Sequence, residues 1–417
     1  MKVALVHDYL NQLGGGERVL DALIKLFPEA PVYTLLHDPS KTQGRYVGKV
    51  KKTSFLDLPF VRRHHRSFIP LMPLAIRSMD LGDEYDLIIS DTAGFAKGIR
   101  YGTKTKHLCY VHTPLRYAWE TKTYFHDSLK NWLIRFFGAL AFAYLRHWDY
   151  LAGQRPDIVL ANSEFIAEKI KRYYHRDAQV LYPPVDTAKF YFESSVIASE
   201  GEASQSQQPG LPREYPRNDK QGYYLALGRF LEYKRFDLII EAFKKNGLPL
   251  KVVGAGRQEL PLRRLAEAGR ASPIVMGGSE AKQSSNIEFI DFQPDEKLCQ
   301  LYAGAKAFIM ANEEDFGLVM AEAQACGTPV IAYAKGGALE IINDPSSDVP
   351  LRKIPKWDFG TVPTGILFSE QTPESLSQAI KKCETMNFDR AVIRKGAERF
   401  SEANFSVGLQ KAIDLIL

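Results

Sequence analysis

Short apolar segments alternate with helix-like segments twice along this chain, and this alternation constrains the fold more than any other feature. The helix-like segments of the first half include residues 17–27 and 163–174. Strands that alternate with helices predict a parallel sheet whose strands are joined by crossover helices. The expected strands span residues 3–6, 32–35, 87–90, 106–111 and 158–161 in the first half, and 223–227, 250–253, 287–289, 307–309 and 330–332 in the second.

The length of the chain and one polar stretch divide it into domains. With 417 residues the chain is too long for one compact core and suits two domains of ordinary size. Residues 199–210 are rich in Ser, Gln, Gly and Pro and offer almost nothing to bury. We therefore expect an N-terminal domain over residues 1–190, a disordered linker insertion over 191–221, a C-terminal domain over 222–390 and closing helices over 391–417.

The composition describes a soluble globular protein, with 45% hydrophobic and 25% charged residues. No uninterrupted apolar run is long enough to predict a transmembrane helix, and the N-terminus has the pattern of a short strand rather than of a signal peptide. A net charge of +5 suits an anionic membrane surface but is too small to predict a nucleic-acid partner. No Cys-x-x-Cys pair is present, so we expect no metal site and no disulfide framework among Cys109, Cys299, Cys326 and Cys383.

Residues 313–330 carry the clearest local pattern. Residues 318–326 have a helix pattern, Gly327 suits a left-handed C-cap, and Pro329 prevents the helix from continuing. Glu314 precedes this helix and Glu322 lies about two turns into it. The two carboxylates are therefore expected on either side of a helix start.

This helix start suits a nucleotide-sugar. The N–H groups around Leu318 and Val319 have no partner within the helix and would bind a phosphate. One of the carboxylates of Glu314 and Glu322 would then accept hydrogen bonds from sugar hydroxyls and the other from a ribose. The alternative is that acidic residues before the helix only compensate its dipole.

Two further loops combine glycine or basic residues with a strand end. Gly15 and Gly16 open a helix after the first strand, and such a turn lets backbone N–H groups approach a phosphate. Their spacing is not that of the dinucleotide fingerprint. Arg229 and Lys234 follow the strand at 223–227, at the edge where ligands of α/β proteins bind, and both suit a pyrophosphate. A tight turn and a solvated basic loop are the respective alternatives.

Polar residues also follow two strands of the N-terminal domain. His112 comes directly after the strand at 106–111, where a packed or solvent-facing histidine is the alternative. Asp91 and Lys97 follow the strand at 87–90, and we expect them on the acceptor side of the site.

Several strings of this sequence resemble one enzyme family. The segments "MKVALVHDYLNQLGGGERVL", "HTPLRYAWE", "YPPVDTAKF" and "EEDFGLVMAEAQACGTPVIAYAKGGALE" resemble retaining glycosyltransferases of family four, which carry a Glu-x₇-Glu motif. They are most similar to the WbaZ-like mannosyltransferase branch, which helps to build bacterial surface polysaccharides. The resemblance implies an α/β protein of the GT-B fold, with two Rossmann-like domains whose parallel sheets face a central cleft.

The resemblance also implies roles for individual residues. The string around Arg229 and Lys234 resembles the segment that binds the diphosphate in the family. His112 matches a family position that contacts the donor sugar. The segment ending at Asp291 matches one whose backbone pairs with the base of the nucleotide. The implied catalytic residues are His112, Arg229, Lys234 and Glu314, and the implied donor-binding residues are Gly15, Gly16, Gly254, Asp291, Phe316, Gly317, Leu318, Val319 and Glu322. No metal ligand is implied.

The implied activity is transfer of a hexose, mannose from GDP-mannose, to a saccharide or polyprenyl-diphosphate-linked acceptor. The resemblance implies no cofactor apart from the nucleotide-sugar donor, and no nucleic-acid partner. We expect a cytoplasmic enzyme at the inner face of the plasma membrane, because basic residues 62–66 precede apolar residues 68–74 and aromatic residues recur over 132–148. Core helices are the alternative for both segments.

Other activities remain open at this point. Close relatives within the resembled family use UDP-sugars, so a UDP-sugar-dependent transferase is one alternative. A non-catalytic scaffold that binds sugar nucleotides is another. An NAD-dependent oxidoreductase is disfavoured by the glycine spacing at residues 14–16.

Overall fold

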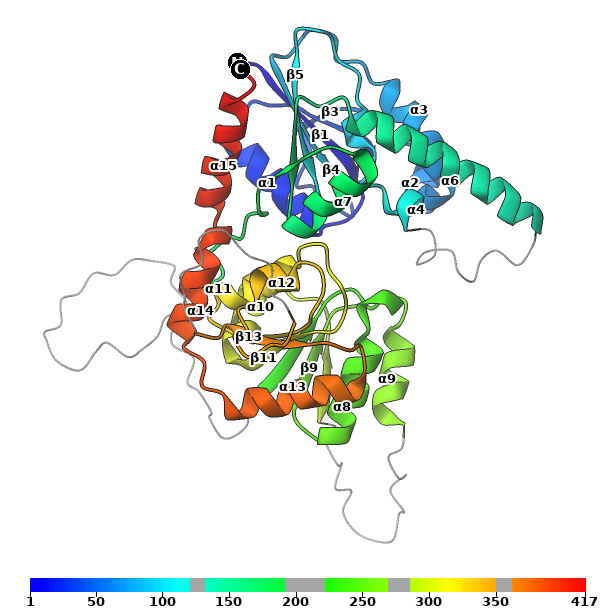
Figure 1. The fold of residues 1–417 in the computed structure, drawn as a ribbon. Helices are drawn as coiled ribbons and strands as arrows, with labels where there is room; N and C mark the ends of the chain where they lie inside the picture. The colour runs from blue at the N-terminus through cyan, green and yellow to red at the C-terminus, as the bar shows by residue number, and fades with distance from the viewer. Residues whose placement is uncertain (121–131, 192–221, 269–285, 350–361) are drawn as a thin grey trace, which may run out of the picture. The chain divides into compact units, whose positions relative to one another are not determined.

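The computed structural model describes residues 1–120, 132–191, 222–268, 286–349 and 362–417 (Figure 1). They form two compact units. Unit 1 comprises Met1–Pro184 together with Glu402–Leu417, and unit 2 comprises Val185–Ser401. Apart from residue 191, the linker expected over 191–221 lies outside the described residues.

Unit 1 contains a sheet of seven strands in the order β3-β2-β1-β4-β5-β6-β7, and every pair is parallel. All five strands predicted for this half of the chain are confirmed. The short strands β3 and β7 were not predicted, because their sequences are mostly polar and partly exposed. The strands are β1 (Val3–Leu10), β2 (Val32–His37), β3 (Val50–Thr53), β4 (Leu87–Thr92), β5 (Lys106–Val111), β6 (Ile158–Ala161) and β7 (Gln179–Val180).

The two faces of this sheet are covered by different helices, so its central strands are apolar almost throughout. Alternate residues of β1 point to opposite faces. Leu5 packs with helices α1 and α15 on one face, whereas Val6 packs with α3 and α6 on the other. The helices of unit 1 are α1 (Gly15–Leu26), α2 (Pro59–His64), η1 (His65–Leu71), α3 (Met72–Arg77), η2 (Ala96–Gly98), α4 (Arg116–Trp119), α6 (Trp132–Gly153), α7 (Glu164–Tyr174) and α15 (Glu402–Asp414).

Unit 2 contains a parallel sheet of six strands in the order β10-β9-β8-β11-β12-β13. The five strands predicted for this half are also confirmed, and β13 was missed. Helices α8 and α13 lie on one side of the sheet, and α10, α11 and α12 lie on the other (Figure 1). The strands are β8 (Tyr223–Leu227), β9 (Leu250–Val253), β10 (Ile287–Ile290), β11 (Ala305–Met310), β12 (Val330–Tyr333) and β13 (Gly365–Phe368).

The core of unit 2 joins β8 and β9 to α8 and α13 through residues such as Tyr224, Val252, Phe243 and Ile380, which are almost fully buried. The helices of unit 2 are η3 (Glu232–Lys234), α8 (Phe236–Asn246), α9 (Glu259–Glu267), α10 (Asp295–Gly304), α11 (Leu318–Ala325), α12 (Ala338–Ile341), α13 (Pro373–Thr385), α14 (Arg390–Ala397) and η4 (Glu398–Phe400).

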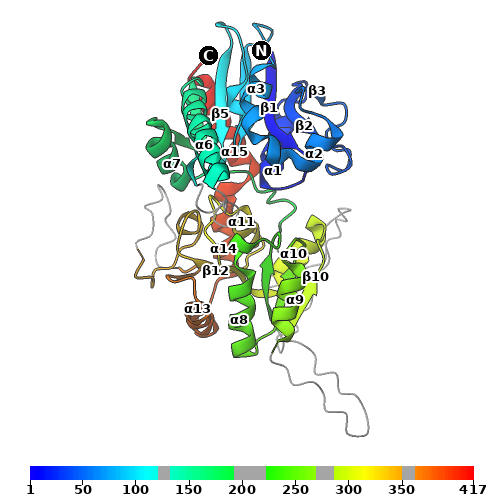
Figure 2. The ribbon, with the colours of Figure 1, turned by 90° about the vertical axis from the view of Figure 1, so that its right-hand side faces the viewer.

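The C-terminal segment divides between the units at Ser401. Helix α14 stays in unit 2, where Arg390 donates hydrogen bonds to the carbonyl oxygens of Gly327 (2.9 Å) and Ala303 (2.7 Å). Helix α15 belongs to unit 1 and lies beside α1 (Figures 1 and 2). The ring centroids of Phe405 on α15 and Tyr110 on β5 are 5.8 Å apart.

Four free thiols are buried in the described residues. Two of them, which stand 27 residues apart in sequence, come together: the sulfur atoms of Cys299 and Cys326 are 3.5 Å apart. Over the described ranges, no helix has the length and apolar character needed to cross a bilayer.

Unit 1 should depend on α15 for its stability. Phe405 is 2% exposed, so Phe405→Ala should lower the free energy of unfolding by about 3–5 kcal/mol through loss of apolar contact and a residual cavity. Val407 on the same helix is 54% exposed, and Val407→Ala should change the free energy of unfolding by no more than about 0.5 kcal/mol. Chemical denaturation of the full chain would measure both, and equal effects would contradict the packing role of α15.

Candidate functional site

In unit 2, the helix predicted after Glu314 is confirmed as α11. It begins at Leu318 because Gly317 adopts a left-handed conformation (φ 93°, ψ 56°), and a side chain there would collide with Met320. It ends where Gly327 adopts φ 71°, the predicted left-handed C-cap. The first-turn N–H groups of α11 are therefore directed toward the loop that contains Glu314.

Glu314 and Lys234 meet in the structure although 80 residues separate them in sequence. The Nζ of Lys234 donates to Oε1 of Glu314, which also accepts from Nδ2 of Asn312 at 2.8 Å. The side chains of Lys234 and Glu314 are 17% and 18% exposed. They meet because β8 and β11 are neighbours in the sheet and the loops that follow parallel strands gather at one edge.

A glycine loop after β12 holds the backbone around Glu314. The N–H of Gly337 donates to the carbonyl oxygen of Glu314 at 2.9 Å. A Cβ atom at Gly336 would lie 2.1 Å from that oxygen, and one at Gly337 would lie 2.0 Å from the carbonyl oxygen of Phe316. Gly336 and Gly337 were not predicted as part of the site, although a Gly-Gly pair three residues after a strand was the available signal.

Two other predicted donor-binding residues of this segment lie in the interior of unit 2. Glu322 is 1% exposed and accepts a hydrogen bond from the hydroxyl of Tyr302 at 3.4 Å. Phe316 is 3% exposed, and its ring packs edge-on against Phe400 at 5.2 Å. Leu318 and Val319 are half-buried at the start of α11, as is Glu314, and Glu313 is exposed, so these residues form the accessible part of the segment.

The basic residues of the loop after β8 differ in exposure and in their ion-pair partners. Arg229 is exposed at the strand end. Arg235 adopts φ 55°, a conformation that favours glycine, and its guanidinium pairs with Asp237 at 3.2 Å. Arg235 therefore binds within its own loop, whereas Lys234 reaches Glu314.

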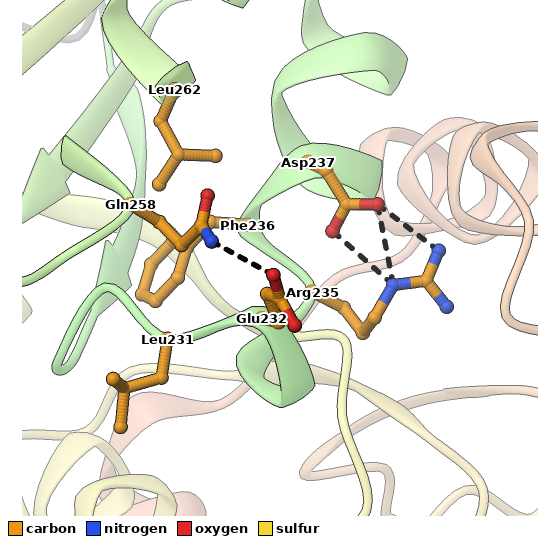
Figure 3. Close-up of a pocket in the computed structure, with 7 residues that line it drawn as sticks. All are labelled: Leu231, Glu232, Arg235, Phe236, Asp237, Gln258 and Leu262. Carbon is orange, nitrogen blue, oxygen red and sulfur yellow. Dashed lines mark hydrogen bonds and ion pairs between the residues drawn. The ribbon is translucent and has the colours of Figure 1, made fainter. Parts of the chain in front are cut away.

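A cavity of about 320 Å³ opens beside this loop (Figure 3). Across it, Nε2 of Gln258 donates to Oε1 of Glu232 at 3.1 Å, and this contact joins the segments that follow β8 and β9. None of the four predicted catalytic residues lines the cavity, which is formed by Leu231, Glu232, Arg235, Phe236, Asp237, Gln258 and Leu262.

Gly254 and Asp291 mark the ends of the next two strands. Gly254 adopts φ 145°, and a Cβ atom there would lie 1.9 Å from the carbonyl oxygen of Gly228. This glycine therefore permits close contact between the loops after β8 and β9. Asp291 is exposed directly after β10.

In unit 1, the structure brings Gly16 and His112 together. A Cβ atom at Gly16 would lie 3.5 Å from Nε2 of His112, whereas Gly15 is exposed at the start of α1. The Nε2 of His112 lies 2.6 Å from Oδ1 of Asp91, and the ring is 15% exposed. His7, within β1, places Nδ1 at 2.8 Å from Oδ2 of the same Asp91 carboxylate. The sequence did not predict that His7 belongs to this group.

Asp8 is a further residue of this edge that was not predicted from the sequence. Its carboxylate accepts hydrogen bonds from the backbone N–H groups of Ala93 (2.7 Å), Phe95 (2.8 Å) and Ala96 (2.6 Å). It therefore holds the loop that follows β4, the strand that ends just after Asp91.

The expectation for Lys97 is wrong. Lys97 is fully buried: its Nζ lies 2.6 Å from Oδ1 of Asp149 and donates to the carbonyl oxygen of Gly94, so the side chain is not presented to an acceptor. In the segment 132–148, Trp148 is 9% exposed and its ring centroid lies 5.4 Å from that of Phe95, so this residue belongs to the core, whereas Tyr144 is 47% exposed. The side chains of residues 132–137 lie outside the description.

Comparison with known families gives a match for each unit. Residues 13–189 match the family described as "Glycosyltransferase Family 4", and residues 207–400 match "Glycosyl transferases group 1". The two matches lie side by side along the chain and together include most of it.

Curated relatives have low sequence identity to the chain. A D-inositol 3-phosphate glycosyltransferase of Thermomonospora curvata is 28% identical over 57% of this chain and 55% of its own length. The chain thus spans about half the length of this relative. A GDP-Man:Man(3)GlcNAc(2)-PP-Dol alpha-1,2-mannosyltransferase of Caenorhabditis elegans is 23% identical, and its alignment covers 100% of this chain and 91% of the relative.

Solved structures share the fold over the whole chain. Anabaena HepE in complex with UDP has a TM-score of 0.64 at 17% identity, covering 99% of this chain and 100% of that one. Sucrose-phosphate synthase from Thermosynechococcus elongatus has a TM-score of 0.65 at 18% identity, covering 100% and 99%. These neighbours establish the architecture as the GT-B fold.

The contact between Gly336 and Glu314 predicts a difference between two glycine substitutions. Gly336→Ala and Gly247→Ala both place alanine at positive φ (64° and 71°), at a cost of about 1–2 kcal/mol each. Nothing lies within 4 Å of a Cβ atom at Gly247, whereas at Gly336 the collision with Glu314 should add about 1–3 kcal/mol. Equal free energies of unfolding in chemical denaturation would show that the loop after β12 does not press on Glu314.

Proposed function

We propose that this chain, which has the GT-B fold and matches two glycosyltransferase families, transfers a hexose with retention of anomeric configuration. The donor is a nucleotide-sugar and the acceptor is a saccharide or a lipid-linked oligosaccharide. The observation that carries the proposal is the contact of Lys234 with Glu314 beside the start of α11. This arrangement combines a cation, helix N–H groups and a carboxylate, which are the groups that a diphosphate and a hexose require.

Lys234 is the residue best suited to the diphosphate. In the absence of a donor its ammonium is paired with the Glu314 carboxylate. A diphosphate offers several anionic oxygens to the same ammonium and to the first turn of α11. Glu314 would then be available to the hydroxyl groups of the sugar, while buried Asn312 continues to donate to its Oε1.

The reaction needs charge stabilisation and alignment. The bond between the anomeric carbon and the diphosphate oxygen breaks while the acceptor oxygen bonds to that carbon from the same face. The acceptor's hydroxyl proton passes to the departing diphosphate. Lys234, Arg229 and the helix start stabilise the charge that develops on that group, which is the term that contributes most in such reactions. In this proposal the chain supplies no covalent nucleophile and no resident metal.

The proposed donor is GDP-mannose. It is supported by the Caenorhabditis elegans relative, whose name contains GDP-Man and whose alignment spans this whole chain. A UDP-sugar is the second candidate, because Anabaena HepE has been solved with UDP and with UDP-glucose. Both donors present the same diphosphate to Lys234.

We further propose that unit 1 contacts an anionic membrane through the segment Pro59–Arg77, which comprises α2, η1 and α3. Apolar side chains are exposed there, with Phe60 at 64% and Leu74 at 59%. Arg63 and Arg66 are exposed in the same segment. Exposed apolar residues next to basic ones suit the headgroup layer of an anionic bilayer.

Lys234→Ala should weaken both nucleotide binding and transfer. A hydrogen bond to a charged group contributes about 1.5–3 kcal/mol, so the Kd for GDP or UDP should rise at least about tenfold. Calorimetry measures the binding, and a radiolabelled-donor assay with GDP-mannose and UDP-glucose measures the transfer. NMR of the product reports the anomeric configuration, and an inverted product would overturn the proposed retention.

Lys251 provides a matched control. It lies on β9 of the same unit, with its Nζ 3.8 Å from a carboxylate oxygen of Glu288. Lys251→Ala should leave Kd and transfer within about twofold, since a surface ion pair contributes little. If the two lysine variants behave alike, the phosphate role of Lys234 is wrong.

Reversing the charges of Arg63 and Arg66 to glutamate should weaken binding to phosphatidylglycerol vesicles at least about tenfold, because each basic residue near an anionic surface contributes about 1 kcal/mol. The matched control reverses Lys171 and Arg172, two exposed basic residues of α7. Co-sedimentation with anionic and neutral vesicles measures the effect. Equal losses in the two variants would point to net charge alone and not to this segment.

A further inference from the structure

A row of ionisable side chains leads through the interior of unit 1 to His112. In the sheet register His7 on β1 lies directly beside Asp91 on β4. The Asp91 carboxylate is held between two imidazoles: Oδ2 lies 2.8 Å from Nδ1 of His7, and Oδ1 lies 2.6 Å from Nε2 of His112. On the far side of His7, Nε2 lies 4.0 Å from Oε1 of Glu17 on α1.

This row of ionisable side chains is buried except at His112. His7, Asp91 and Glu17 are between 0% and 5% exposed, whereas the side chain of His112 is 15% exposed. Gly16 lies against both rings, since a Cβ atom there would be 3.5 Å from His112 and 3.7 Å from His7. His112 is therefore the residue of this row that a ligand can reach.

We propose that His7 is a positioning residue for sugar transfer. It holds the Asp91 carboxylate so that Oδ1 faces His112. The N–H at Nε2 of His112 then donates to Asp91, and Nδ1 of the same ring faces the donor sugar. The proposal rests on the proposed sugar transfer and on the donor-sugar contact that the sequence resemblance implies for His112. It adds a residue that does not touch the donor and acts through Asp91.

Electrostatics support this role. Burial lowers the pKa of His7, but the hydrogen bond and charge of Asp91, with the charges of Glu17 and Asp8, outweigh it and raise the pKa to about 9. Burial raises the pKa of Asp91, yet His112 and His7 together lower it below its usual value. Burial raises the pKa of Glu17. At neutral pH the carboxylate of Asp91 is thus an anion held by a cationic His7.

The sign of the pH dependence follows from these directions. The pKa of His7 in the folded chain lies above its ordinary value of 6.5, so its charged contacts stabilise the fold fully below pH 6.5. That contribution is lost as the pH rises through about 9. Transfer should decline over the same alkaline range, because neutral His7 holds Asp91 less firmly.

Two substitutions of His7 separate its contributions. His7→Asn retains a side-chain N–H near the position of Nδ1 but carries no charge, whereas His7→Leu removes both. His7→Leu should lower kcat about 10- to 100-fold with a much smaller change in donor KM, because misplacing a contact group costs rate at this scale. His7→Asn should keep more of kcat than His7→Leu, at the lower level that the native enzyme reaches above pH 9, and should lose the decline near pH 9.

His107 supplies the control for loss of a buried imidazole. It lies on β5 of the same sheet, is fully buried, and bonds to the hydroxyl of Ser90 at 2.8 Å. Burial, together with the charges of Arg155 and Arg176, lowers the pKa of His107 to about 3, so it is neutral where His7 is charged. His107→Leu should leave the pH profile of the folded enzyme unchanged.

A measurement without turnover distinguishes this inference from the proposed function. ¹⁵N NMR of the His112 ring should show Nε2 protonated in the native chain and in His7→Asn, and a mixture of tautomers in His7→Leu. Absence of transfer with every donor, combined with this NMR pattern, would reject the proposed function and retain the positioning of His112. An unchanged His112 ring and an unchanged pH profile in the His7 variants would overturn the inference. If His7→Leu does not fold, the pH profile of His7→Asn decides.

Discussion

Burial of both faces of each parallel sheet is the constraint on which the rest of this protein depends. The central strands are apolar almost throughout, since helices cover them on both sides, so their polar residues are concentrated where the strands end. All neighbouring strands run in the same direction, and their carboxyl ends therefore meet at one edge. His7, Asp91 and His112 collect at that edge in unit 1, and Lys234 and Glu314 collect there in unit 2.

Charges at these edges are held in pairs, which keeps them in place at low solvent exposure. The Asp91 carboxylate lies between two imidazoles, and the Glu314 carboxylate lies against an ammonium and an amide. An unpaired charge at such depth would be costly. In unit 2 the pair of Lys234 and Glu314 is partly exposed, as the proposed exchange of the carboxylate for a phosphate at Lys234 requires. In unit 1 the pairs are buried except at His112, which suits a role in orientation.

Glycine residues determine how closely the loops of unit 2 can approach. Gly336 and Gly337 lie against the backbone at Glu314 and Phe316, and Gly254 lies against Gly228, at distances that leave no room for a Cβ atom. These contacts explain why Glu314 has a defined position although it lies in a loop. They also show that a glycine in such a chain can be required for packing of one loop on another as well as for contact with a ligand.

Periodicity and local patterns were sufficient to predict ten strands, the helix after Glu314 and its left-handed end at Gly327, because these features depend on neighbours along the chain. The short strands β3 and β7 carry polar sequences and form only because a neighbouring strand offers backbone partners. The burial of Lys97 against Asp149, the contact of His7 with Asp91 and that of Lys234 with Glu314 join residues 52, 84 and 80 positions apart. The sequence by itself determined which chemical groups end the strands, whereas only the tertiary structure decided which of them are paired, buried or presented to a ligand, because burial and pairing depend on neighbours that are distant along the chain.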